Sequence, residues 1–233
     1  MTMISHPEYN FLYVAITKTG CHTTKQSLVL SGLGTKADKN TPLAELSWKH
    51  PQHYTALEER QLIGEEDYNN RFKFTFVRNP WGRLLSSYTS IYRSREGRRQ
   101  KLVTYEDAIS PEKFNEWAVD VLTNRIVEKC SRKYPTCDHQ RIMHWPCLDW
   151  ITDKDGQIIV DFVGKHETLE EDYKKILSLI EARVKCPMPH YVPLKRVNVS
   201  NQGFDYKHYY SDETRDLVSK HFEKDIEEFG YEY

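Results

Sequence analysis

The stretch Tyr13-Val-Ala-Ile-Thr-Lys18-Thr-Gly20-Cys-His-Thr-Thr24 decides how this chain of 233 residues is expected to fold. Phe11–Thr17 is short, apolar and composed of residues that favour strands, which predicts a buried strand. Thr23–Ser31 is predicted to form a helix that stops at the glycine that follows. Between the two lies a small polar loop that carries Lys18. A strand, a polar loop with a lysine and a helix together offer backbone N–H groups and a cation to a phosphate.

A second segment repeats this arrangement with an arginine. Phe72–Val77 is predicted to be a strand, and Arg78 follows it directly. Asn79 and Pro80 have the properties of a helix cap and a first helical residue, and the apolar positions from Trp81 onward recur at helical spacing. An arginine at the strand end and a serine, Ser86, eight residues later offer a second anion site. Two such sites indicate a ligand with anionic groups at two places.

The rest of the chain predicts the fold class. Ile158–Gly164 is predicted to be a third strand, and helices are expected to begin at Ser110-Pro111, at the capping box that Thr168 opens, and at Ser211 for the closing helix to Phe229. Strands separated by helices predict an α/β fold with a P-loop-like, doubly wound, mainly parallel sheet and flanking helices, in a single domain over residues 1–233. Ligands of such sheets bind at the carboxyl ends of the strands, where both anion motifs lie.

Composition excludes several classes of protein. The chain has 33 Lys and Arg residues and 34 Asp and Glu residues. Because these charges nearly balance, no overall electrostatic field favours binding of nucleic acid. No apolar stretch approaches the roughly 20 residues of a membrane helix, and the first residues lack the pattern of a signal peptide. The five cysteines are odd in number and irregularly spaced. We therefore expect a reduced, cytoplasmic protein without an integral membrane segment.

The two anion motifs together resemble those of the sulfotransferases that use 3′-phosphoadenosine-5′-phosphosulfate (PAPS). The similarity is greatest to the carbohydrate-type branch, which includes Golgi enzymes and soluble bacterial relatives. Thr17-Lys18-Thr-Gly-Cys-His-Thr23 is similar to the family's 5′-phosphosulfate loop, Pro-Lys-Thr-Gly-small-Thr-Ser. Val77-Arg-Asn-Pro-Trp-Gly-Arg-Leu-Leu-Ser-Ser-Tyr88 matches its 3′-phosphate motif throughout. Thr17 replaces the usual proline, and Cys21 and His22 replace small residues.

The resemblance implies a role for each residue of the two motifs. Lys18 would stabilise the leaving phosphate oxygen in a metal-independent sulfuryl transfer, and Arg78 and Ser86 would hold the 3′-phosphate. The loop residues expected to surround the 5′ end of PAPS are Lys18, Thr19, Gly20, Cys21, His22, Thr23 and Thr24. Arg83, in the same helix as Ser86, either takes part in the site or serves packing.

The acceptor hydroxyl needs a base, for which histidine is suited because its pKa lies near neutrality. In the family the base often lies between the two motifs, on a segment that resembles Lys-His-x-x-Ala. His53-Tyr-Thr-Ala56 is similar to that segment, so His53 is the predicted base and His50 the alternative. An ordinary surface histidine is the competing interpretation of His53. Glu167 at a predicted strand end is a further candidate, with helix capping as its alternative role.

Three functions remain open on the sequence alone. The leading hypothesis is a sulfotransferase that binds PAPS and its product 3′-phosphoadenosine 5′-phosphate (PAP) and sulfates a carbohydrate hydroxyl. The alternatives are a non-catalytic protein that binds PAP and a P-loop-like nucleotide phosphotransferase. The phosphotransferase is disfavoured because Lys18 precedes the glycine, unlike in a Walker A motif. The Cys/His group from Cys130 to Cys147 lacks the spacing of a zinc site, so no metal is expected. The basic run Arg93–Lys101 would bind an acidic glycan or the nucleotide, or would form a solvated loop.

Overall fold

The computed structural model describes residues 9–33, 53–95, 110–123, 144–184, 193–194 and 205–233. The chain divides into two compact units, which we describe separately. The first unit holds residues 1–78, 136–139 and 147–197, and the second holds residues 79–135, 140–146 and 198–233. The prediction of a single domain over residues 1–233 stays a prediction.

The first unit is built on a parallel sheet of three strands in the part of the chain that the structure describes. The strands are β1 (Phe11–Val14), β2 (Phe72–Val77) and β3 (Phe162–Lys165), in the spatial order β1-β2-β3. Tyr13 pairs with Phe74 in the first ladder, and Phe76 pairs with Gly164 in the second. Because all three strands run the same way, the segments that follow them meet at one edge of the sheet.

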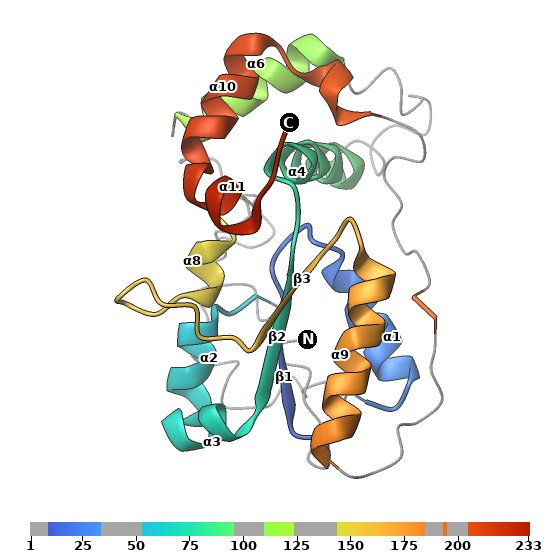
Figure 1. Ribbon diagram of the computed structural model, residues 1–233. Coiled ribbons are helices and arrows are strands. Elements are labelled where there is room, and N and C mark those ends of the chain that lie inside the picture. Colours follow the sequence, from blue (N-terminus) through green and yellow to red (C-terminus); the bar gives the residue numbers. More distant parts are fainter. Residues whose placement is uncertain (1–8, 34–52, 96–109, 124–143, 185–192, 195–204) are drawn as a thin grey trace. The chain divides into compact units, whose positions relative to one another are not determined.

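Helices cover both faces of this sheet. On one face lie α1 (Cys21–Leu30) and α9 (Leu169–Val184), and on the other lie α2 (Ala56–Ile63), α3 (Glu65–Asn70) and α8 (Leu148–Ile151) (Figure 1). The predicted α/β fold with a doubly wound parallel sheet and flanking helices is thereby confirmed.

Alternation along the strands places the aromatic residues on one face. Tyr13 of β1 and Phe74 of β2 stack with their ring centroids 5.0 Å apart. Side chains from this face pack against Leu28 of α1 and Ile176 of α9 in one buried cluster. The aromatic core thus holds α1, and with it the loop that precedes α1, against β1 and β2.

The second unit is helical in its described residues. Its helices are α4 (Pro80–Arg95), α6 (Pro111–Leu122), the 3-10 helix η2 (Tyr206–Tyr209), α10 (Asp212–His221) and α11 (Glu223–Phe229). The predicted caps of the first two are present. Asn79 Oδ1 accepts a hydrogen bond from Gly82 N at 3.3 Å, and Ser110 Oγ accepts one from Lys113 N at 3.2 Å. None of the helices within the described ranges is both long and apolar enough to cross a membrane.

Four predicted elements have different boundaries in the structure. The first helix spans Cys21–Leu30 instead of Thr23–Ser31. The first strand ends at Val14 instead of Thr17, because the chain turns at residues 17–20. The third strand begins at Phe162 instead of Ile158, which forms an isolated antiparallel bridge with Thr152. The closing helix is divided at Phe222 into α10 and α11.

Candidate active site

The Lys18 loop joins β1 to α1 through two residues with positive φ angles. Lys18 has φ of 66° and Gly20 has φ of 86°, in the left-handed region that few residues other than glycine adopt. Gly20 is also the N-cap of α1, whose first N–H groups have no partner within the helix. Lys18 is half-buried and lies directly before this helix end. A cation and a helix N-terminus therefore occur together at the carboxyl end of β1.

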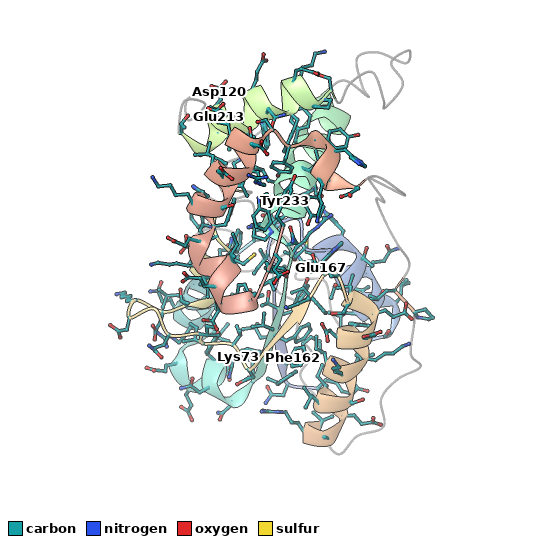
Figure 2. All side chains as sticks on the ribbon, turned by 45° about the horizontal axis from the view of Figure 1, so that its top comes forward. Lys73, Asp120, Phe162, Glu167, Glu213 and Tyr233 are labelled. Atoms are coloured by element: carbon teal, nitrogen blue, oxygen red, sulfur yellow. The ribbon has the colours of Figure 1, made fainter. Side chains whose placement is uncertain are left out.

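Gly20 is pressed against the turn between β3 and α9. A Cβ atom at Gly20 would lie 3.1 Å from Cδ2 of Leu169 and 3.2 Å from Cδ2 of His166. His166 follows β3 directly, and its backbone N–H donates to Val77 O at 2.8 Å. Figure 2 shows the adjacent Glu167 at this end of the sheet and Lys73 and Phe162 at the opposite end. The ends of all three strands thus converge on the Lys18 loop.

The threonines of the loop are buried and shape its backbone. The Thr19 hydroxyl donates to Ile16 O at 3.0 Å, and the Thr24 hydroxyl donates to Gly20 O at 3.4 Å. Thr23 is buried as well, and Cys21 belongs to the aromatic core cluster. That these four residues contact PAPS stays a prediction.

His22 is exposed on the first turn of α1. Loss of hydration lowers its pKa, and the charges of Lys25 and Lys18 lower it further. Lys25 itself is buried, which lowers its pKa. Lys18 and Lys25 are therefore near enough to His22 to affect its pKa, although the first cause of its shift is loss of hydration.

Arg78 lies next to the Lys18 loop. It follows the last residue of β2, and its Nη1 donates to the backbone carbonyl of Lys18 at 3.2 Å. The structure thus brings together the lysine of the first motif and the arginine of the second. Two cationic side chains from neighbouring strand ends suit a ligand with two anionic groups.

His53 is buried and bound to the end of β1. Its Nδ1 lies 2.8 Å from the carbonyl oxygen of Ala15. Because a carbonyl only accepts, Nδ1 carries the proton, and in the neutral ring Nε2 holds the lone pair. The Trp150 ring lies edge-on, with centroids 6.2 Å apart. His53 is therefore a buried histidine with a fixed tautomer and not an ordinary surface histidine. That it acts as the base stays a prediction.

The backbone after His53 is fixed by a capping box. The Thr55 hydroxyl accepts a hydrogen bond from Glu58 N at 3.2 Å, and the Glu58 carboxylate accepts one from Thr55 N at 2.8 Å. The sequence Thr-Ala-Leu-Glu carries the signature of this cap, which could have predicted the start of α2. The alternative base His50 lies outside the described residues.

Ser86 and Arg83 belong to α4 in the second unit. Ser86 is buried, and its contact with the 3′-phosphate stays a prediction. Arg83 is 2% exposed, and its Nη1 donates to Trp145 O at 2.6 Å. This contact supports the packing role of Arg83, since the guanidinium holds α4 to the turn at residues 144–146.

The Cys/His group is described only in part. Cys130, Cys137 and His139 lie outside the described residues, as do residues 96–101 of the basic run. Burial, followed by the charges of Arg83 and His221, lowers the pKa of His144 to about 3. His144 is therefore neutral at physiological pH. The described part of the chain contains no group of three His, Cys, Asp or Glu side chains that could hold a metal ion.

The sequence did not single out His166 or Asp172. The Asp172 carboxylate accepts hydrogen bonds from Lys165 N at 2.9 Å and from the Thr168 hydroxyl at 2.7 Å, and it pairs with Lys175. Burial opposes its ionisation, but these donors together lower the pKa of Asp172 below its ordinary value. It thereby fixes the turn that presents His166 to Gly20. The position of His166 directly after a strand was the signal that could have identified it.

Comparison with known proteins places these features in a family. Residues 1–232 match the sulfotransferase family. Among curated proteins, the chain is 25% identical to carbohydrate sulfotransferase 11 of Mus musculus, over 83% of this chain and 57% of the relative. It is 29% identical to carbohydrate sulfotransferase 14 of Danio rerio, over 78% of this chain and 50% of that relative. The chain thus spans about half the length of these relatives. The search of solved structures found no significant match.

Proposed function

Because the chain belongs to the sulfotransferase family, we propose that it transfers a sulfuryl group from PAPS to a hydroxyl group of a carbohydrate. The observation that supports this most is the contact between the two anion motifs at the strand ends, where Arg78 Nη1 lies 3.2 Å from Lys18 O. The acceptor class follows from the similarity to carbohydrate sulfotransferases. The cytoplasmic location stays a prediction.

In the proposed reaction, the acceptor oxygen attacks the sulfur of PAPS in line with the leaving phosphate. The new bond joins the acceptor oxygen to sulfur, and the bond between sulfur and the 5′-phosphate oxygen breaks. Its electron pair stays on that oxygen, where negative charge develops. Lys18 and the N–H groups at the start of α1 supply positive potential there, as in phosphoryl transfer, where positioning and electrostatics dominate.

His53 would take the proton of the acceptor hydroxyl on Nε2. The hydrogen bond from Nδ1 to Ala15 O supports this role in two ways. It fixes the tautomer, and it stabilises the imidazolium that forms when Nε2 gains a proton. Since Ala15 lies between β1 and the Lys18 loop, the same segment of backbone anchors both proposed catalytic side chains.

The test is an assay with radiolabelled PAPS and a panel of glycans. We expect label to move to at least one glycan, with stoichiometric formation of PAP. Binding of PAP without transfer to any acceptor would favour the non-catalytic alternative. Transfer of phosphate that depends on ATP instead of PAPS would favour the phosphotransferase.

A further inference from the structure

We propose that Arg78 is a positioning residue for Lys18 as well as a ligand of the 3′-phosphate, so that the two ends of the donor bind cooperatively. This inference rests on the proposed function. It would explain why the protein selects a donor that carries a 3′-phosphate. It is based on the hydrogen bond that Arg78 of the second motif donates to the backbone carbonyl of Lys18 in the first.

The Lys18 backbone needs such support. Its φ of 66° lies in the left-handed region, which is unfavourable for a residue with a Cβ atom. Conformations of this kind persist where surrounding contacts determine them. The Thr19 hydroxyl, bound to Ile16 O, holds the loop on one side. The Arg78 guanidinium holds the carbonyl of Lys18 itself, through a donor whose positive charge strengthens the hydrogen bond.

Hydrogen bonds hold the strand before Arg78 on both sides. Val14 pairs with Thr75 in the ladder, and the Thr75 hydroxyl donates to Val14 O at 2.7 Å. On the other side of β2, Val77 O accepts from His166 N at 2.8 Å. Arg78 therefore leaves the sheet from a fixed point, with strands on both sides of the one that carries it.

An arginine can serve both roles because its planar guanidinium carries five N–H donors. The hydrogen bond to Lys18 O uses a donor on Nη1, and the proposed contact with the 3′-phosphate would use other donors of the same group. A phosphate bound there would restrict the guanidinium and so stabilise the carbonyl of Lys18. Coupling between two sites is reciprocal, so an ordered Lys18 loop would in turn favour binding of the 3′-phosphate.

The experiment compares PAP with adenosine 5′-monophosphate (AMP), which lacks only the 3′-phosphate. Affinities are measured by calorimetry for the wild-type protein, Arg78→Gln and Ser86→Ala. If Arg78 also positions the Lys18 loop, Arg78→Gln should weaken AMP binding by about tenfold, as expected for loss of a charge-assisted hydrogen bond. Ser86→Ala is the comparator, because its proposed contact is with the 3′-phosphate. Ser86→Ala should weaken the binding of PAP but leave the binding of AMP unchanged.

Amide hydrogen exchange supplies a readout without any ligand. Residues 18–23 should exchange faster in Arg78→Gln than in the wild-type protein. If Arg78→Gln fails to fold, Arg78→Lys replaces it with the same expectations, since an ammonium lacks the planar fork. Equal AMP affinity and equal exchange in variant and wild type would overturn the positioning role while leaving the proposed function intact. Failure of the wild-type protein to bind PAP would instead overturn the proposed function and this inference together.

Discussion

Replacing Gly20 by alanine tests the close packing of the Lys18 loop. Two effects add up at this position. The φ angle of 86° costs an L-residue about 1–2 kcal/mol, and the new Cβ would lie 3.1 Å from Leu169 and 3.2 Å from His166. The contacted atoms are side-chain atoms that can move by a few tenths of an ångström, so we expect about 1 kcal/mol more, at the low end of overpacking. Gly20→Ala should therefore lower the free energy of unfolding by about 2–3 kcal/mol.

Gly156→Ala is the matched control. Gly156 has a similar φ of 78°, but no atom lies within 4 Å of the place where its Cβ would be. Urea unfolding of both variants, followed by circular dichroism, gives the two losses of free energy. Their difference measures the contact with Leu169 and His166, because the backbone strain and the change in the unfolded chain are common to both. PAP affinity should fall in Gly20→Ala alone.

Equal losses in Gly20→Ala and Gly156→Ala would refute the close contact between the loop and the turn after β3. A neutral effect of Gly20→Ala would also contradict the left-handed conformation of this residue. Either result would mean that the backbone at Gly20 is less constrained than the structure indicates.

The other predictions concern the proposed catalytic residues and the turn behind them. Lys18→Ala should lower kcat by about 10²–10³ while PAP affinity changes far less, and steady-state kinetics with calorimetry would show it; unchanged turnover would exclude the leaving-group role. His53→Gln should lower kcat by about 10²–10⁴ and remove the acidic limb of the pH profile of kcat/KM, and a normal profile would exclude His53 as the base. Asp172→Asn should cost about 2 kcal/mol of stability at neutral pH. Because the pKa of Asp172 is lowered in the folded protein, this difference is present above the unfolded pKa and disappears as pH falls through the folded pKa. Urea unfolding of the wild type and the variant across this pH range checks the prediction. A difference in the free energy of unfolding that stays constant down to acid pH would contradict the role of the Asp172 carboxylate.

The sequence predicts the strands best where they are bounded by clear signals. The second strand has the predicted bounds because its apolar run is followed at once by the helix start at Asn79-Pro80. The first strand was predicted too long, since Ala15 and Ile16 are buried like strand residues but lie beyond the ladder, whose last pair is Val14 with Thr75. An apolar run predicts that residues are buried, but the residue at which strand pairing ends depends on the partner strand.

The same distinction applies to the candidate site. Motif spacing predicted that Lys18 and Arg78 follow parallel strands, but their contact joins residues 60 positions apart and depends on the register of β1 against β2. A slip of one residue would turn the side chains of a strand to the opposite face. The stacked rings of Tyr13 and Phe74 oppose such a slip, because they would lose their shared core face. Aromatic packing in the middle of the sheet therefore sets where the arginine meets the lysine backbone at its edge.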